Sequence, residues 1–240
     1  MNNFLESKFW AISKPVLFTI LIILLSYAAQ IILFQYLEST YFSKNQELYS
    51  AYGYRWSIII TLTASVYIIL ISLLIKNRND NSTIKEYLKI YSVPTSKLLA
   101  WIGALFVMML ILSIFSLMLS RPFVHEYFLL AYQSSHYLIF FWLAIFLIGP
   151  VSEEILFRGF LFTGIVSSRA GNIVAIIISS LIWTFIHYQY DLYDLSQLFL
   201  LGLILGASRV YTGSLLTPIA LHSIVNLNVL ITCAFYIKTA

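Results

Sequence analysis

The chain has 240 residues, of which 60% are hydrophobic and only 10% are charged, and its mean hydropathy is +0.89. A soluble domain of this length would carry about a quarter of its residues as Asp, Glu, Lys and Arg, so the composition excludes an ordinary soluble protein and indicates one that crosses the membrane several times. The net charge of +4 is small, and we attribute it to orientation in the bilayer rather than to a nucleic-acid partner.

Apolar runs of transmembrane length recur along the whole chain. We expect an all-α polytopic membrane protein in which residues 1–240 form a single membrane domain, a bundle of about seven (six to eight) transmembrane helices with a polar cavity inside it. The first run is too long for the core of a signal peptide, so we interpret it as an uncleaved helix. The expected spans are Val16–Leu37, Ser57–Ile75, Leu98–Leu119, His136–Val166, Asn172–Tyr188, Leu195–Val210 and Leu215–Ile237.

The fourth of these spans contains Gly149 and Pro150, which could either kink one helix or end it in a hairpin. After Pro150 only about 16 residues remain before Ser167, or about 24 Å of helix, which is short for a hydrocarbon core of about 30 Å. We therefore expect one kinked helix and seven spans, whereas a hairpin at this point would make eight.

Lys and Arg residues are distributed unevenly between the two sides of the expected bundle. With the N-terminus inside, nine of them fall on the cytoplasmic side and four outside, as the positive-inside rule requires. We therefore expect an integral membrane protein with a cytoplasmic N-terminus. The cytoplasmic set is Lys8, Lys14, Lys76, Arg78, Lys85, Lys89, Lys97, Arg169 and Arg209, and the outer set is Lys44, Arg55, Arg121 and Lys238.

The cytoplasmic loop after the second span contains the segment TIKEYLKIY. Thr83 and Glu86 have the spacing of a capping box, and Ile84, Leu88 and Tyr91 would share one face of a helix. We expect either a short amphipathic helix lying on the inner leaflet or an ordinary solvated loop.

Two features further along the chain are expected to serve helix packing. Gly202 and Gly206 form a small-xxx-small pair, which predicts that two helices approach closely there. Cys233 is the single cysteine, so no intrachain disulfide can form, and its apolar surroundings in the sequence indicate a small packing residue.

Three ionisable residues interrupt the fourth span in the stretch VSEEILFRGF. An ionisable side chain near the bilayer centre costs at least about 2.5–3.5 kcal/mol, so it usually faces a cavity or a partner. Glu154 and Arg158 are four residues apart on one helical face, which predicts an ion pair that supports the site. Glu153 lies about 100° around the helix from Glu154, and its carboxylate is left as the candidate for chemistry.

Other polar side chains are expected at membrane depth. His187 lies in the fifth span, while His222 and Asn226 lie four residues apart on one face of the last. Counting about 1.5 Å per residue from the cytoplasmic ends places Glu153 about 20 Å deep, His187 about 23 Å deep and the other two about 10–17 Å deep. These depths permit all four groups to meet in one cavity near the middle of the membrane.

These motifs together resemble those of a known family. Glu153-Glu154-x-x-x-Arg158, then Trp183-x-x-x-His187, then His222-x-x-x-Asn226 are similar to the three motifs of the CAAX-protease and bacteriocin-processing family, also called CPBP or Abi. The flanking FRGFLF and TGSLLTPIALH agree with this resemblance, which covers a catalytic core of about residues 140–230. One departure is Trp183, since the second motif usually starts with Phe.

The resemblance implies intramembrane proteolysis without a covalent intermediate. By resemblance, Glu153 and His187 would activate a water molecule, His222 and Asn226 would form an oxyanion hole, and the paired glutamate and arginine would support the site. Peptide hydrolysis needs such a base, an acid and oxyanion donors, and a covalent acyl-enzyme has no evident nucleophile here.

A metal site is the alternative chemistry for the same residues. Glu153, His187 and His222 could supply the three protein ligands of a catalytic Zn²⁺. The chain has no His-Glu-x-x-His motif, and Asn226 is a poor zinc ligand but a good hydrogen-bond donor. We therefore favour catalysis without a cofactor and keep zinc as the alternative.

Two other classes of function remain open from the sequence. The chain could be a non-catalytic scaffold or bacteriocin-immunity protein that binds a peptide partner, or a transporter with Glu153 as a proton relay, although no internal repeat supports the latter. A composition rich in Ile, Asn, Lys and Tyr is typical of a low-GC bacterium. We therefore expect a bacterial membrane enzyme that matures a secreted peptide or a membrane-associated substrate.

Overall fold

The structure is a computed structural model that describes residues 2–40, 63–74, 83–133, 135 and 138–239. Throughout these ranges the regular elements are helices, without a strand. The helices outside the central one are α1 (Asn2–Thr40), an unlabelled helix (Thr63–Leu74), α4 (Ile84–Leu88), α5 (Thr95–Met118), α6 (Glu126–Gln133), α10 (Asn172–Phe185), α11 (Leu192–Thr212) and α12 (Leu216–Thr239).

The expected all-α membrane fold is confirmed. Five described helices are long and apolar enough to cross a membrane, and the two shorter apolar helices, Thr63–Leu74 and Asn172–Phe185, lie where two more spans were expected. Residues 57–62, 75 and 136–137, which belong to expected spans, lie outside the described ranges, as do Lys44, Arg55, Lys76 and Arg78.

The fourth expected span is one continuous helix over Leu138–Ser167, so the prediction of a single helix rather than a hairpin is confirmed. Pro150 lies inside it, between two π-helical segments in which the backbone hydrogen bonds lengthen to five residues. The successive segments are α7 (Leu138–Leu143), η2 (Ala144–Ile148), α8 (Gly149–Glu154), η3 (Ile155–Leu161) and α9 (Phe162–Ser167), together called the site helix below.

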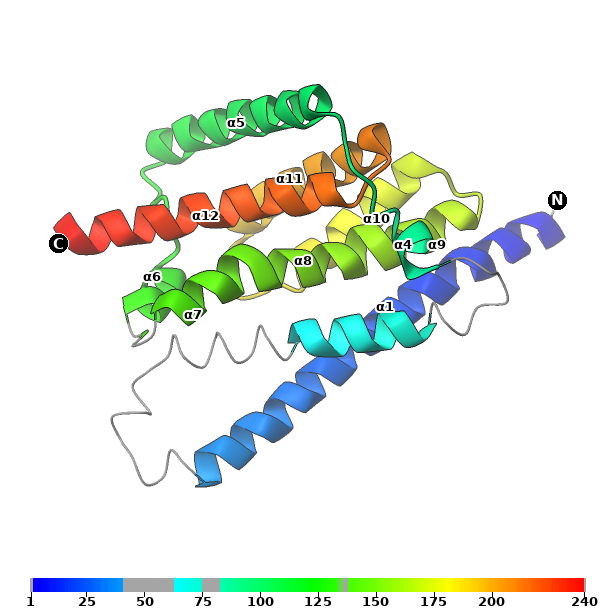
Figure 1. Cartoon of the computed structure of the whole chain (residues 1–240), viewed down its shortest axis with the longest axis horizontal. Helices are drawn as coiled ribbons and strands as arrows, with labels where there is room; N and C mark the ends of the chain where they lie inside the picture. The colour runs from blue at the N-terminus through cyan, green and yellow to red at the C-terminus, as the bar shows by residue number, and fades with distance from the viewer. Residues whose placement is uncertain (1, 41–62, 75–82, 134, 136–137, 240) are drawn as a thin grey trace.

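The site helix lies at the centre of the bundle (Figure 1). On one side α12 packs against η2 and α8, and α11 lies between α10 and α12. On the other side α1 crosses the site helix at η3 and α9, while α5 contacts α11 and α12 at the opposite edge of the bundle. The residues buried in the main core therefore come from the site helix and from every helix that touches it.

Close approach of α10 and α11 depends on two glycines. A Cβ at Gly202 would lie 2.9 Å from Cβ of Ser180, and one at Gly206 would lie 3.1 Å from Cγ2 of Ile176. Both distances are shorter than ordinary van der Waals contact, so the predicted packing role of the pair is confirmed.

The predicted capping box at the start of α4 is also confirmed. The backbone N–H of Thr83 donates to Oε2 of Glu86 at 2.8 Å, and the backbone N–H of Glu86 donates to Oγ1 of Thr83 at 3.2 Å. The expected apolar face was only partly right, because Tyr87 and Leu88 are buried while Ile84 is exposed. Helix α4 packs against η3.

Large apolar side chains cover the outer surface of the bundle, among them Leu110 and Met118 of α5 and Ile32 of α1. A membrane protein needs such a surface facing lipid. Cys233 is fully buried within α12, which confirms its predicted packing role.

Candidate active site

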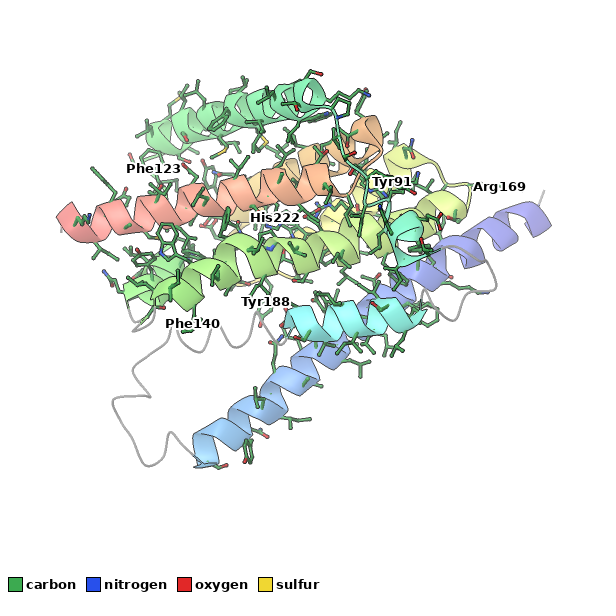
Figure 2. The ribbon with its side chains drawn as sticks, viewed as in Figure 1. Tyr91, Phe123, Phe140, Arg169, Tyr188 and His222 are labelled. Atoms are coloured by element: carbon green, nitrogen blue, oxygen red, sulfur yellow. The ribbon has the colours of Figure 1, made fainter. Side chains whose placement is uncertain are left out.

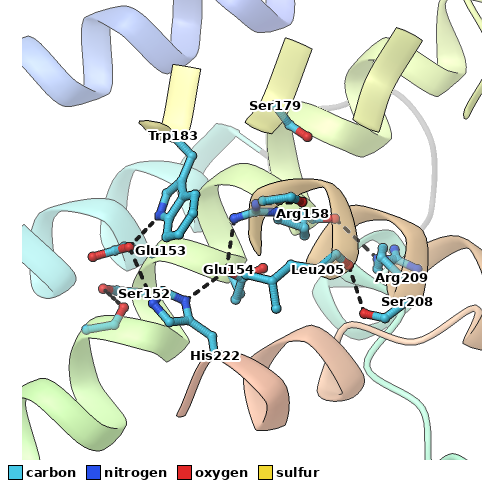
Figure 3. A network of polar contacts seen from close by, with 12 residues as sticks. Ser152, Glu153, Glu154, Arg158, Ser179, Trp183, Leu205, Ser208, Arg209 and His222 are labelled. Carbon is cyan, nitrogen blue, oxygen red and sulfur yellow. Dashed lines mark hydrogen bonds and ion pairs between the residues drawn. The ribbon is translucent and has the colours of Figure 1, made fainter. Parts of the chain in front are cut away.

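A buried network of three side chains lies at the middle of the site helix (Figure 3). Nη1 of Arg158 donates to Oε1 of Glu154 at 2.9 Å, and both side chains are fully buried, so the predicted ion pair is confirmed. The same oxygen accepts a hydrogen bond from Nδ1 of His222 at 3.0 Å, and Nη2 of Arg158 donates to the carbonyl of Gly202. Glu154 is therefore engaged from two sides and held in place.

Glu153 has a different environment from its neighbour. Its side chain is 23% exposed, whereas that of Glu154 is completely buried. Oε2 of Glu153 accepts a hydrogen bond from the indole Nε1 of Trp183 at 2.6 Å and lies 4.0 Å from Nε2 of His222. The carboxylate that the sequence left unpaired is thus the one with access to a small molecule.

His187 lies just beyond the end of α10, which corrects the expectation that it sits within a helix. The helix ends at Phe185, and the next residues form turns up to Asp191, which caps the start of α11. Nδ1 of His187 is 2.9 Å from the carbonyl of Trp183, which can only accept a hydrogen bond, so this nitrogen carries the proton. Nε2 is left with a lone pair.

Trp183 links the groups that the three motifs contribute. Its ring is fully buried, with ring centroids 5.2 Å from His187 and 5.3 Å from His222, both edge to face. The guanidinium carbon of Arg158 lies 4.9 Å from the centroid of the same ring. From the sequence, Trp183 was expected only to be a large aromatic in place of Phe. A buried Trp usually needs a hydrogen-bond acceptor for its indole N–H, and this requirement could have identified Trp183 as a partner of an intramembrane carboxylate.

The fourth expected site residue, Asn226, lies on α12, and its side chain contacts the backbone of η2. Its Nδ2 donates to the backbone carbonyl of Ile145 at 2.8 Å. Glu153, His187 and His222 all surround the Trp183 indole, whereas Asn226 is anchored to η2, one turn further along α12 from His222.

Glu153, His187 and His222 are the residues that would have to supply the three protein ligands of a catalytic zinc. Among the described residues, no three His, Cys, Asp or Glu side chains gather closely enough to hold a metal ion. In this arrangement Glu153, His187 and His222 do not lie close enough together to share one zinc ion.

An apolar cavity of about 270 Å³ lies between α1 and α10, beside the turn that carries His187. Its lining is almost entirely aliphatic and aromatic: Ile20, Ile23, Leu24, Tyr27, Ile182, Phe185, Ile186 and Tyr188. The hydroxyl of Tyr27 donates to the carbonyl of Ile186, which joins the two walls.

The site lies between the two ends of the bundle. Figure 2 shows His222 between the end marked by Phe123 and Phe140 and the end marked by Tyr91 and Arg169. The loop containing Tyr91 and the one containing Arg169 were both expected on the cytoplasmic side, and they do lie at the same end. A polar site at this depth is enclosed by apolar helices on its flanks.

The described helices thus form a membrane bundle whose interior holds one partly exposed carboxylate and two imidazoles, and ionisable groups at membrane depth usually mark a functional site. Residues 135–228 are similar to the family described as Type II CAAX prenyl endopeptidase Rce1-like. The match agrees with the resemblance of these residues to the CPBP family.

The curated relatives include a protein of Escherichia coli named "Uncharacterized 24.3 kDa protein". It is 39% identical over 82 residues, a stretch that covers 33% of this chain and 38% of the relative. No solved structure gives a significant match.

Proposed function

We propose that the protein hydrolyses a peptide bond inside the membrane with a water molecule activated by Glu153 and His187. The observation that carries this proposal is the difference between two adjacent glutamates. Arg158 and His222 engage Glu154, whereas Glu153 keeps 23% of its side chain exposed. A carboxylate that can meet water is able to take its proton, and one that is fully buried in an ion pair is not.

His187 is the second group assigned to the water. Its Nδ1 proton is held by the Trp183 carbonyl, so Nε2 presents a lone pair that can accept a hydrogen bond from water. In the proposed reaction the oxygen of water attacks the scissile carbonyl carbon while its proton passes to Glu153 or His187. Collapse of the tetrahedral intermediate breaks the C–N bond, and the same proton goes to the leaving amine.

His222 and Asn226 are the proposed donors to the oxyanion. Glu154 holds the His222 ring through Nδ1, and this leaves Nε2 directed to the side of Glu153, 4.0 Å from its Oε2. Because Nδ1 already donates to Glu154, Nε2 is a donor only when the His222 ring carries two protons and is a cation. The Asn226 amide has a second N–H beyond the one that Ile145 accepts. Donors fixed before the reaction stabilise the charge that develops on the carbonyl oxygen.

The proposed substrate is an apolar peptide segment. The cavity between α1 and α10 is lined by aliphatic and aromatic side chains and lies beside His187, so it suits a large apolar side chain near the scissile bond. We propose that the protein acts in a bacterial membrane and matures a secreted or membrane-associated peptide.

We also propose that hydrolysis needs no metal, since among the described residues no three His, Cys, Asp or Glu side chains lie close enough together to hold one. Turnover by purified protein, measured with and without chelator, tests this. Full activity after exhaustive chelation is expected. Loss of activity that Zn²⁺ restores would instead establish a metalloprotease.

The central experiment compares membrane peptides from cells that express wild-type protein or Glu153→Gln, grown in parallel. Lysis and incubation in H₂¹⁸O follow, and mass spectrometry identifies new C-termini. Peptides whose new carboxylate carries ¹⁸O are expected only with wild type, because water supplies that oxygen. Identical peptide sets from the two strains would overturn the proposal and favour a non-catalytic scaffold or immunity protein. Glu126→Gln, a change at a carboxylate on α6, is the matched control and should behave as wild type.

A further inference from the structure

The π-helical turn before the two glutamates leaves one backbone carbonyl without its helical partner. The backbone N–H of Gly149 donates to the carbonyl of Ala144, five residues back. In the same register the next donor would be position 150, and its acceptor would be the carbonyl of Ile145. Position 150 is Pro150, which has no N–H to give.

Asn226 supplies the missing donor from another helix. Its Nδ2 lies 2.8 Å from the oxygen of Ile145, and α12 packs against both η2 and α8 at this point. A carbonyl oxygen can only accept, so the group that faces it must be the NH₂ end of the amide. A backbone carbonyl left unpaired inside a membrane bundle is costly, which gives this contact a clear energetic reason.

We infer that Pro150 is a positioning residue for Asn226. Because Pro150 has no backbone N–H, the Ile145 carbonyl stays free to accept the hydrogen bond that anchors the Asn226 side chain. With one N–H of the amide fixed on Ile145, the direction of the second N–H is fixed as well. Asn226 lies on the helical face of α12 that also carries His222, one turn away. This inference rests on the proposed function, in which Asn226 donates to the oxyanion.

The same anchor connects two motifs that are far apart in the sequence. Pro150 lies three residues before Glu153 on the site helix, and Asn226 lies four residues after His222 on α12. The contact therefore fixes the register between the helix that carries the proposed base and the helix that carries the proposed oxyanion donors. Both sets of groups must be correctly placed at the same time for hydrolysis.

The pairing is tested first by thermal stability in detergent, which needs no substrate. Asn226→Ala is expected to lower the Tm in the wild-type background, because the Ile145 carbonyl loses its donor. In the Pro150→Ala background the backbone N–H at position 150 becomes available to that carbonyl, so the same change should cost much less. Equal Tm losses in the two backgrounds would overturn the pairing.

The catalytic part is tested by a double-mutant cycle in kcat and KM. Asn226→Ala should lower kcat by about 10²–10³ with little change in KM, as the loss of one oxyanion donor does. Pro150→Ala should lower kcat by roughly ten-fold, because Asn226 stays present but is less well oriented towards the oxyanion. The Tm of this variant should be unchanged or raised, since alanine is the better helix former. In the Asn226→Ala background, Pro150→Ala should have no further effect on kcat.

Other outcomes separate the possible causes of failure. A kcat loss from Pro150→Ala that persists in the Asn226→Ala background would mean that Pro150 acts by displacing Glu153, and would overturn the inference. Pro15→Ala is the matched control, since Pro15 also lies inside a helix but on α1, and it should leave kcat unchanged. If wild-type protein cleaves no peptide, the proposed function fails, and the Tm cycle still decides whether Pro150 and Asn226 are coupled.

Discussion

The indole Nε1 of Trp183 donates a hydrogen bond to Oε2 of Glu153 at 2.6 Å, so the proposed base is oriented by a side chain from another helix. A phenylalanine at this position would fill similar space but could not make the bond. This chain thus orients its accessible carboxylate with a donor that the usual residue of the motif lacks.

Trp183→Phe is therefore expected to lower kcat/KM by roughly ten-fold or more, because a hydrogen bond to a charged group contributes about 1.5–3 kcal/mol and about 1.4 kcal/mol corresponds to a factor of ten. Steady-state cleavage of a quenched peptide measures this effect. Trp142→Phe, a similar loss of volume in the second apolar cluster, is the control and should keep full activity. Equal activity losses from the two variants would show that packing, rather than the N–H, is responsible.

The two adjacent glutamates should respond oppositely to the same substitution. Glu153→Gln is expected to abolish turnover and leave the Tm near that of wild type. Glu154→Gln removes the charge that neutralises the fully buried Arg158, and breaking a buried ion pair in this way costs about 3–5 kcal/mol. Thermal stability and cleavage measured on both variants check this. A stable Glu154→Gln protein together with an unstable Glu153→Gln protein would mean that the two roles are reversed.

The apolar cavity should affect substrate binding more than catalysis. Leu24 lines the cavity and is well exposed, so Leu24→Trp fills the space without disturbing the core. We expect KM to rise several-fold for substrates with a bulky apolar residue at the cleavage site, while kcat changes little. Leu21→Trp is the matched control on the same helix, since Leu21 is also exposed but does not line the cavity. Equal KM values for the two variants would rule out the cavity as a binding site.

An ion pair at the membrane edge should make stability depend on pH. Arg121 pairs with Asp191, the N-cap residue of α11. A hydrogen bond from the backbone N–H of Asp194, together with the Arg121 guanidinium, lowers the pKa of Asp191. A lowered pKa means that the folded protein favours the charged carboxylate. This contribution is fully present above the ordinary pKa of about 3.9 and is lost as the pH falls through the lower folded value.

Asp191→Asn keeps a capping side chain but removes the charge, so it isolates this contribution. The Tm of wild type is expected to exceed that of Asp191→Asn at pH 7, and the difference should close below about pH 4. Thermal unfolding in detergent over this pH range measures it. A difference that stays constant down to pH 3 would contradict the assignment.

The orientation predicted from Lys and Arg can be measured with single cysteines in a Cys233→Ala background. Lys85→Cys should react with a membrane-impermeant thiol reagent only from the cytoplasmic side, and Ser135→Cys only from the other. Because the site helix is continuous, Thr239→Cys should also label from outside. Labelling of Thr239→Cys from the cytoplasm would require an even number of spans and contradict the seven-span arrangement.

Much of the fold could be predicted because it follows from local patterns. Length and hydropathy of each run are enough to place a membrane helix, since every backbone polar group must be satisfied within the segment. The capping box at Thr83 and Glu86 and the ion pair of Glu154 with Arg158 are likewise set by spacing within one helix. His187 was misplaced because the end of α10 depends on the turn that leads to the Asp191 cap, a boundary that hydropathy does not mark.

The sequence by itself determined which residue types the site contains and that Glu154, four residues from Arg158, would be the paired glutamate. Only the tertiary structure decided which groups meet across helices: Trp183 with Glu153, His222 with Glu154, and Asn226 with Ile145. The physical reason is that periodicity specifies the face of a helix but neither its rotation against its neighbours nor its relative height. Those are set by close contacts such as Gly202 against Ser180 and by the carbonyl that Pro150 leaves without a backbone donor.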